Sequence, residues 1–242
     1  MRYFIHFCYD GTNYHGWQVQ PNGSSVQAEL QSALSTLLRK PIEVVGAGRT
    51  DAGVHARKMV AHFDVNEPLD EHQIAYRLNR ILPGDIAVEK VEEVNGDMHA
   101  RFSAKSRTYH YYIHTKKAPF RRAYSLEIHY DLDFDAMNKA AAFLLTQNDF
   151  ASFCKTGADV KTTICQVTHA EWHQTSPTIW YFEITANRFL RNMVRAVVGT
   201  LIDVGRHRIN YDEFKQIVEN KTRTAAGESM PGYALFLEEI LY

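Results

Sequence analysis

Residues 46–56 read Gly-Ala-Gly-Arg-Thr-Asp-Ala-Gly-Val-His-Ala, and the rest of the chain is organised around this stretch. Its three glycines lack a Cβ atom, so the backbone can bend sharply and another chain or a ligand can approach closely. Between them lies one carboxylate, Asp51, and Arg49 precedes it by two residues. A nearby cation favours the charged form of a carboxylate. The pattern therefore predicts a tight loop that presents an ionised acid, which suits a nucleophile.

The glycines of this loop also suggest a nucleotide-binding loop or a plain turn. Gly46 and Gly48 begin a G-x-G pattern, but Asp51 stands in place of a third glycine and no Lys-Ser or Lys-Thr pair follows. Dinucleotide binding and P-loop nucleotide binding are therefore not supported. A plain hairpin turn stays open, because Asp-Ala-Gly between two apolar runs is ordinary turn chemistry.

Composition indicates an ordinary globular protein. Of the 242 residues, 45% are hydrophobic and 23% are charged, which is typical of such proteins. No apolar run approaches the roughly 18 residues of a membrane span, and no charged leader precedes an apolar stretch. We therefore expect a cytoplasmic protein with no membrane partner. The three cysteines form no C-x-x-C pair, so we expect reduced thiols rather than a disulfide framework or a zinc knuckle.

Charge is unevenly distributed along the chain. The net charge is −1, yet residues 101–122 contain seven lysines and arginines and no acid. A local excess of this kind is a candidate phosphate-binding surface, although a solvated strand and loop would have the same composition. The basic residues of this run are Arg101, Lys105, Arg107, Lys116, Lys117, Arg121 and Arg122.

The first half of the chain predicts a β-α-β-β-α-β order. An alternating aromatic run over residues 2–10 predicts a strand that is apolar on both faces and therefore central. Ser24 and Gln27 predict a capping box for the first helix, and Asp70 with Gln73 predicts the start of the second. Strands are expected at residues 42–45, 54–65 and 86–94. This order is typical of a ferredoxin-like unit.

The second half predicts a similar series. Strands are expected at residues 109–114, 162–173, 179–187 and 233–241, with helices from Asp133 or Asp135 to residue 145 and over residues 189–204 and 211–220. We therefore predict an α+β fold of two ferredoxin-like (βαββαβ) halves, residues 1–104 and 105–242, related by pseudo-duplication. The halves are expected to share a mainly antiparallel sheet with helices on one side and a binding cleft between them.

If the substrate is a base within folded RNA, several residues suit work on that base once it is flipped out. Such an enzyme needs a group to occupy the vacated space and a surface on which the base can stack. Arg49 is a candidate to fill the gap or to bind phosphate. Tyr109 is a candidate to stack on a uracil and to accept a proton from C5, and Leu235 is a candidate to close the opposite face. Tyr109 as a plain core aromatic remains the alternative.

Further basic residues surround these candidates. Arg188, Arg191 and Arg195 occur at helical spacing, with Arg195 one turn beyond Arg191 on roughly the same face, and one of the three is a candidate anchor for Asp51. Lys105 and Arg107 border the aromatic strand. These residues are candidates for RNA contact, and a solvated helix face is the alternative for Arg188 and Arg191.

Four motifs resemble those of the TruA-type tRNA pseudouridine synthases. Residues 46–56 resemble the signature around that family's catalytic aspartate over the whole loop, and residues 107–111, Arg-Thr-Tyr-His-Tyr, resemble its second motif. Residues 187–195 resemble the helix whose arginine pairs with the aspartate. Residues 230–237 resemble the closing motif, although glycine at 232 and alanine at 234 depart from the family's proline and glycine.

This resemblance implies isomerisation of uridine to pseudouridine in tRNA, at positions 38, 39 and 40 of the anticodon arm. It gives Asp51 the catalytic role, places Tyr109 against the target uridine and pairs Arg195 with Asp51. It also implies a homodimer. The isomerisation changes no oxidation state and gains no group, so no cofactor is expected. Attack by Asp51 on C1′, attack on C6, and removal of a sugar proton all stay open.

Two other function classes fit parts of the chain. A non-catalytic RNA-binding protein with an RRM-like sheet would need the aromatics and cations but no acid in a glycine loop. A glycosidase or nucleosidase would need a second carboxylate near Asp51, and the nearest in sequence are Glu43 and Asp64. His169 and His173 share a strand face, but we identify no cysteine or carboxylate at ligand spacing, so no metal site is expected.

Overall fold

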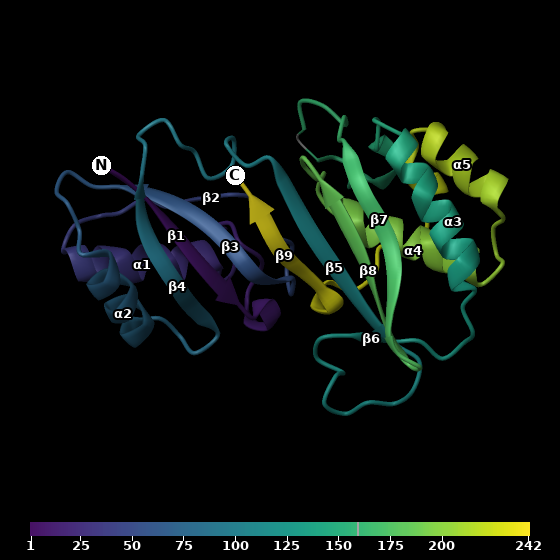
Figure 1. The fold of residues 1–242 in the computed structure, drawn as a ribbon, viewed down its shortest axis with the longest axis horizontal. Coiled ribbons are helices and arrows are strands. Elements are labelled where there is room, and N and C mark those ends of the chain that lie inside the picture. The colour runs from purple at the N-terminus through teal and green to yellow at the C-terminus, as the bar shows by residue number, and fades with distance from the viewer. Residues whose placement is uncertain (159) are drawn as a thin grey trace. The chain divides into compact units, whose positions relative to one another are not determined.

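The structure, a computed structural model, describes residues 1–158 and 160–242. Over these residues the protein is α+β, with five α-helices and mainly antiparallel strands (Figure 1). The chain divides into two compact units. Unit 1 comprises Met1–Lys105 and Phe236–Tyr242, and unit 2 comprises Ser106–Leu235.

The sheet of unit 1 is built around β1 (Arg2–Tyr9). This strand pairs antiparallel with β3 (His55–Asp64) on one side and β4 (Ile86–Val94) on the other, so its predicted central position is confirmed. The short β2 (Val45–Gly46) pairs with β3, which reduces the strand expected at residues 42–45 to two residues. The last strand, β9 (Leu235–Leu241), runs parallel to β3.

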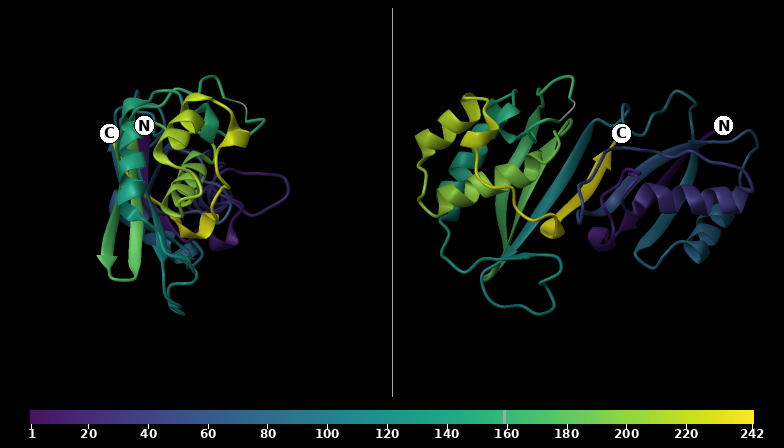
Figure 2. Two further views of the ribbon diagram at one scale, coloured as in Figure 1. Left: turned by 90° about the vertical axis from the view of Figure 1, so that its right-hand side faces the viewer. Right: turned by 180° about the vertical axis from the view of Figure 1, so that it is seen from behind.

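Two α-helices belong to unit 1. The N-cap of α1 (Val26–Leu38) is Ser25, whose hydroxyl accepts from the backbone N–H of Ala28, so the capping box predicted at Ser24 and Gln27 is wrong. Ser24 instead donates its hydroxyl to Asn13 O at 2.8 Å, because it still belongs to the preceding loop. The cap predicted for α2 (Glu71–Ile81) is confirmed, since Asp70 accepts from Gln73 N–H at 3.0 Å. Seen from behind, α1 lies in front of the strands of this unit (Figure 2).

The sheet of unit 2 has the order β5-β8-β7, formed by β5 (Ser106–His114), β8 (Ile179–Ala186) and β7 (Val167–Ser176). All of these pairs are antiparallel, and the short β6 (Leu126–Glu127) adds a parallel pair beside β5. Tyr111, Phe182 and Trp172 align across the three strands and are buried. The side chains between them point to the opposite, partly exposed face, because neighbouring residues of a strand alternate between faces.

Three α-helices belong to unit 2: α3 (Phe134–Phe143), α4 (Met193–Gly205) and α5 (Tyr211–Glu219). Asp133, one of two predicted caps, is the N-cap of α3, and Asn138 of this helix bonds both the N–H and the C=O of Trp172 on the edge strand β7. The helix predicted from residue 189 begins only at Met193, because Asn192 has left-handed backbone (φ 69°). In the view from behind, α4 lies in front of the strands of this unit (Figure 2).

Short 3₁₀ segments complete the described structure. They are η1 (Gly11–Asn13), η2 (Leu144–Thr146), η3 (Ala151–Phe153), η4 (Arg223–Ala225) and η5 (Gly232–Ala234). Of all the helices among residues 1–158 and 160–242, none is long and apolar enough to cross a membrane.

Candidate active site and its supports

Asp51 opens a tight turn. The N–H of Val54 donates to Asp51 O at 3.2 Å, which closes a four-residue turn, and Gly53 within it has φ +73°. A positive φ at this position of a turn favours glycine, as the sequence predicted. Asp51 is half-buried and Arg49 is exposed. The turn therefore holds the backbone of the acid while part of its side chain stays accessible.

Residues 14–17 support the Asp51 turn, although no local pattern connects the two segments. The N–H of Gly53 donates to Tyr14 O at 3.2 Å, and the N–H of Trp17 donates to Thr50 O at 3.3 Å. Gly16 has φ +95°, and a Cβ atom built on it would lie 2.2 Å from Thr50 O. Only a residue without a side chain permits this approach, so the loop around residue 16 and the loop around Asp51 fit each other closely.

Buried polar contacts fix the residues on either side of Asp51. Tyr9 and Thr50 share a buried hydrogen bond of 2.8 Å between their hydroxyls. His55 is 1% exposed, and its Nδ1 accepts the N–H of Gly11 at 3.0 Å. His55 also stacks on Phe236 with ring centroids 4.5 Å apart, so it links β3 to β9. The acid is thus preorganised, since its neighbours are held by unit 1 before any ligand arrives.

Tyr109 lies on β5 opposite Ile184, and its ring meets Phe189 edge-on at 5.1 Å between centroids. The side chain is half-buried, so one part of it packs and another is accessible. Arg107, two residues earlier, donates from Nη1 to Asn187 O at 2.7 Å. These contacts join the second motif to the start of the motif at residues 187–195.

Arg195 contacts the beginning of the closing motif. Its Nε donates to Met230 O, and the N–H of Met230 donates back to Arg195 O at 3.1 Å. Tyr111 donates its hydroxyl to Pro231 O at 3.0 Å, and burial raises the pKa of this phenol above its usual value, while Arg195 acts in the opposite direction. Leu235, which follows in the motif, is 5% exposed. Unit 2 therefore brings together the second motif, the third motif and residues 230–235 of the closing motif.

One face of α4 holds the segment before the closing motif. Asn192 donates to Ser229 Oγ at 2.5 Å, and the N–H of Gly227 donates to Thr200 Oγ1 at 2.9 Å. Between these contacts, a Cβ atom on Gly199 would lie 1.8 Å from Glu228 O. The helix thus has to carry glycine at this position to let the segment lie against it. Local patterns gave no signal for this contact, because the two segments are far apart in sequence.

The remaining predicted RNA-binding residues lie in different surroundings. Arg188 is half-buried beside Cys165, where burial raises the pKa of the thiol to about 11 and Arg188 opposes the rise. Arg191 is exposed but precedes α4, so the helical spacing predicted for Arg188 and Arg191 is wrong. Lys105 is exposed and donates from Nζ to Tyr242 O at 3.0 Å.

The most exposed part of the basic run is the loop of residues 116–124 in unit 2. Phe120 is 100% exposed and Tyr124 is 43% exposed. Four cations are exposed in the same loop: Lys116, Lys117, Arg121 and Arg122. Cations interleaved with aromatic rings are the composition of surfaces that bind single-stranded nucleic acid.

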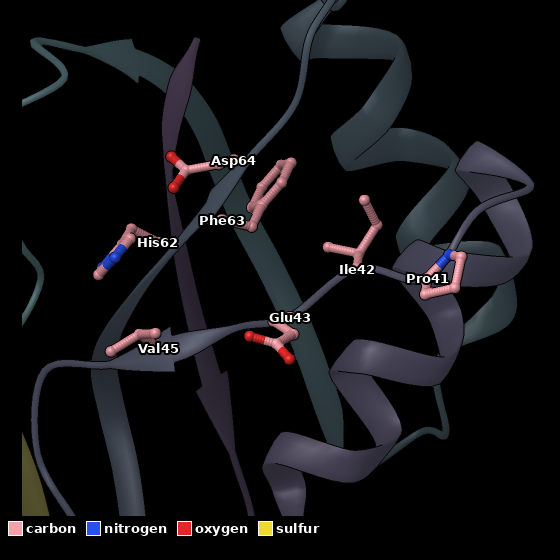
Figure 3. A pocket seen from close by; sticks show the side chains of 7 residues that line it. All are labelled: Pro41, Ile42, Glu43, Val45, His62, Phe63 and Asp64. Atoms are coloured by element: carbon pink, nitrogen blue, oxygen red, sulfur yellow. The ribbon is translucent and has the colours of Figure 1, made fainter.

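Figure 3 shows a pocket of unit 1 whose lining includes Glu43 and Asp64, the two acids nearest to Asp51 in sequence. Asp64 lies at one end of β3, a strand of 10 residues, and the Asp51 turn precedes the other end. A strand of this length spans about 30 Å. Asp64 is also paired with Arg2 at 2.7 Å, which lowers the pKa of the carboxyl. These acids therefore do not form a glycosidase pair with Asp51, because such a pair needs a separation of roughly 5 to 9.5 Å.

A candidate metal-ligand group lies on β7. The ligand atoms of His169, Glu171 and His173 are all within 4.8 Å of one another. The prediction that no carboxylate lies at ligand spacing here is wrong, because Glu171 lies between the two histidines on the same face of the strand.

Comparison with known proteins identifies the family. The family model described as tRNA pseudouridine synthase matches residues 6–103 and 140–242. The chain is 58% identical over its whole length to a tRNA pseudouridine synthase A of Bacteroides fragilis, covering 96% of that protein. A protein of the same name from Bacteroides thetaiotaomicron is 55% identical, with all of this chain and 90% of that protein covered. One from Acetivibrio thermocellus is 39% identical, with 97% and 96% covered. The chain therefore belongs to the tRNA pseudouridine synthase family.

Proposed function

We propose that this chain isomerises uridine to pseudouridine in tRNA, with Asp51 as the catalytic nucleophile. The reaction breaks the bond between N1 and C1′, turns the base and joins C5 to C1′; the hydrogen on C5 leaves as a proton and N1 takes up a proton, so the atoms balance. Family membership supports the reaction. The observation that carries the role of Asp51 is its place in a turn held by Gly53, Tyr14 and Thr50, with its side chain still partly exposed.

Asp51 suits this role for an electrostatic reason. Breaking the glycosidic bond develops positive charge at C1′, and a fixed carboxylate stabilises that charge or forms a covalent intermediate with it. Because the turn is already folded, the enzyme does not have to order the acid during the reaction. Arg49, exposed and two residues away, is proposed to bind backbone phosphate or to occupy the place of the flipped base.

Tyr109 is proposed to stack on the flipped uridine and to accept the proton from C5. Its half-buried ring is braced by Phe189, so an exposed portion of a rigid aromatic is available for stacking. Leu235 is proposed to close the opposite side of the base and Arg195 to pair with Asp51. The contact of Arg195 with Met230 supports a positioning role as well, because it ties the arginine to the motif that contains Leu235.

The tRNA backbone is proposed to contact Lys105, Arg107, Arg188 and Arg191, with the loop of residues 116–124 as a further contact. The exposed cations and the fully exposed Phe120 of this loop support its inclusion. Binding through these residues should weaken as salt rises, since neutralised phosphates release their counterions.

Several finer points complete the proposal, some implied by the family resemblance and others by the composition and the order of the elements. The substrate uridines are placed in the anticodon arm, the protein is placed in the cytoplasm, and two copies are proposed to form a homodimer. Residues 1–104 and 105–242 are proposed to be ferredoxin-like halves that arose by duplication and flank an RNA-binding cleft. The order β1-α1-β2-β3-α2-β4 in unit 1 supports this view of the first half.

The experiment is tritium release from tRNA labelled at uracil C5, measured with the intact protein, Asp51→Asn and Asp97→Asn. Asp97 is an exposed acid of unit 1 and serves as the matched control. Asp51→Asn should lower the rate by about 10³-fold or more, as removal of a nucleophile does. Filter binding should show that both variants still bind the tRNA.

Two outcomes would contradict the proposal. Tritium release by Asp51→Asn at the rate of the intact protein would exclude Asp51 as the nucleophile. Binding of tRNA by the intact protein with no release at all would favour the RNA-binding module without catalysis.

A further inference from the structure

The partly exposed face of the unit 2 sheet carries a regular array of polar side chains. On this face His110 of β5, Glu183 of β8 and Glu171 of β7 are aligned as direct cross-strand neighbours. Beside them, Tyr181 of β8 is aligned with His173 of β7. The face is opposite to the one on which the buried aromatics of these strands pack, and none of these residues has a role in the function proposed above.

Three of these side chains converge. Residues 169, 171 and 173 alternate along β7, so they point to the same side of the sheet. Glu171 Oε2 lies 4.0 Å from His169 Nε2 and 3.9 Å from His173 Nε2. The two imidazole rings are nearly parallel, with an interplanar angle of 11° and centroids 5.8 Å apart. Two imidazole nitrogens and one carboxylate oxygen therefore border one small volume.

Two features of the cluster destabilise the folded protein unless an ion or ligand binds there. The Nε2 atoms of His169 and His173 are buried and have no hydrogen-bond partner among residues 1–158 and 160–242, although buried polar atoms rarely lack one. Glu171 also stands directly opposite Glu183 on the neighbouring strand, and like charges at such positions are destabilising. Glu183 Oε2 is hydrogen-bonded to His110 Nε2 at 2.8 Å, and Glu183 Oε1 lies 3.4 Å from His169 Nε2 without forming a hydrogen bond to it. A cation between these groups would accept the lone pairs of the two nitrogens and offset the repulsion.

We infer that His169, Glu171 and His173 bind a divalent transition-metal ion, with zinc as the reference case. Two histidines and one carboxylate are a common zinc set, which leaves a position open for water or for Glu183. Bonds of about 2.1 Å in tetrahedral geometry place ligand atoms about 3.4 Å apart. Rotations of these partly exposed side chains have to bring the observed 3.9 and 4.0 Å, and a separation of the two histidine nitrogens of up to 4.8 Å, to that value. Calcium and magnesium are disfavoured, since they prefer oxygen ligands.

The consequence is a metal site separate from the isomerisation chemistry. All three ligands come from β7, the outer strand of the β5-β8-β7 sheet, and Glu183 comes from its neighbour β8. A metal that also takes Glu183 would cross-link the two strands. We therefore expect the metal to stabilise unit 2 without supplying a step of the reaction.

The test uses the full-length protein freed of metal by chelation and titrated with Co²⁺ and Zn²⁺. Intense visible absorption of Co²⁺ reports a low-coordinate site, and calorimetry gives the Zn²⁺ stoichiometry and Kd. The variants are Glu171→Gln, the double variant His169→Gln with His173→Gln, and Glu183→Gln. The control is His72→Gln, which removes an exposed histidine of α2 outside the cluster.

The intact protein and His72→Gln should each bind one equivalent of metal ion and show the intense visible absorption of Co²⁺. The double variant should lose both the Zn²⁺ binding measured by calorimetry and the Co²⁺ absorption. Glu183→Gln should weaken binding by about 10-fold or more, as loss of a group next to the ligands does. Equal binding by the intact protein and the double variant, or weak binding of adventitious metal only, would overturn the inference. Circular dichroism checks that each variant is folded. If the double variant is unfolded, an unchanged affinity of Glu171→Gln for Zn²⁺ would overturn the inference instead.

Discussion

The turn that holds Asp51 depends on the close fit of residue 16, so Gly16→Ala should be damaging. Gly16 has φ +95°, where an alanine is strained by about 1 to 2 kcal/mol. The new Cβ atom would also lie 2.2 Å from the carbonyl oxygen of Thr50, a backbone atom that cannot rotate away. Separating the two loops to relieve this contact costs about 1 to 3 kcal/mol more, as overpacking does. We expect a total destabilisation of about 2 to 5 kcal/mol.

Gly48→Ala is the matched control, because a Cβ atom on Gly48 would have no atom of the described residues within 4 Å. Its stability should stay within about 1 kcal/mol of the intact protein, on either side. The free energy of unfolding is measured with urea for both variants, and kcat/KM by tritium release. Gly16→Ala should also lower kcat/KM at temperatures where it is folded, because the shift displaces Asp51. Equal stabilities of the two variants would refute the reasoning, since it attributes the difference to the positive φ of residue 16 and to the contact with Thr50.

Two further predictions concern pH and the support of the closing motif. Burial lowers the pKa of His62 to about 4 from 6.5, and its Nδ1 accepts the N–H of Ala100. Between these two pH values the unfolded chain therefore binds more protons than the folded protein. The free energy of unfolding should fall by up to about 3 kcal/mol as the pH drops from 6.5 to 4. Urea unfolding across this range should show a flatter profile for His62→Asn, and an unchanged profile would contradict the assignment. Gly199→Ala should cost about 1 to 3 kcal/mol and reduce activity, because its Cβ would lie 1.8 Å from Glu228 O, whereas Gly84→Ala, with open space around it, should have little effect. Equal melting temperatures for the Gly199 and Gly84 variants would argue against that contact.

The sequence indicated the chemistry because the chemistry resides in short local patterns. The glycine loop around Asp51 and the Asp70 cap of α2 depend on neighbours a few residues away, and the structure has both a turn with positive φ at Gly53 and the predicted cap. The central position of β1 followed from a strand that is apolar on both faces. The error at the start of α1 is also local: Ser24 and Ser25 are neighbouring serines, and the N-cap is Ser25 rather than the predicted Ser24.

What supports the candidate site came only from the tertiary structure, since those contacts join residues that are distant in sequence. No pattern near Asp51 indicates that Gly16 and Tyr14 close its turn, and none near Arg195 indicates that Met230 contacts it. The site roles of Tyr109, Leu235 and the RNA-binding cations stay predictions. The group of His169, Glu171 and His173 differs, because the two-residue period of a strand puts all three on one face and the pattern is therefore local.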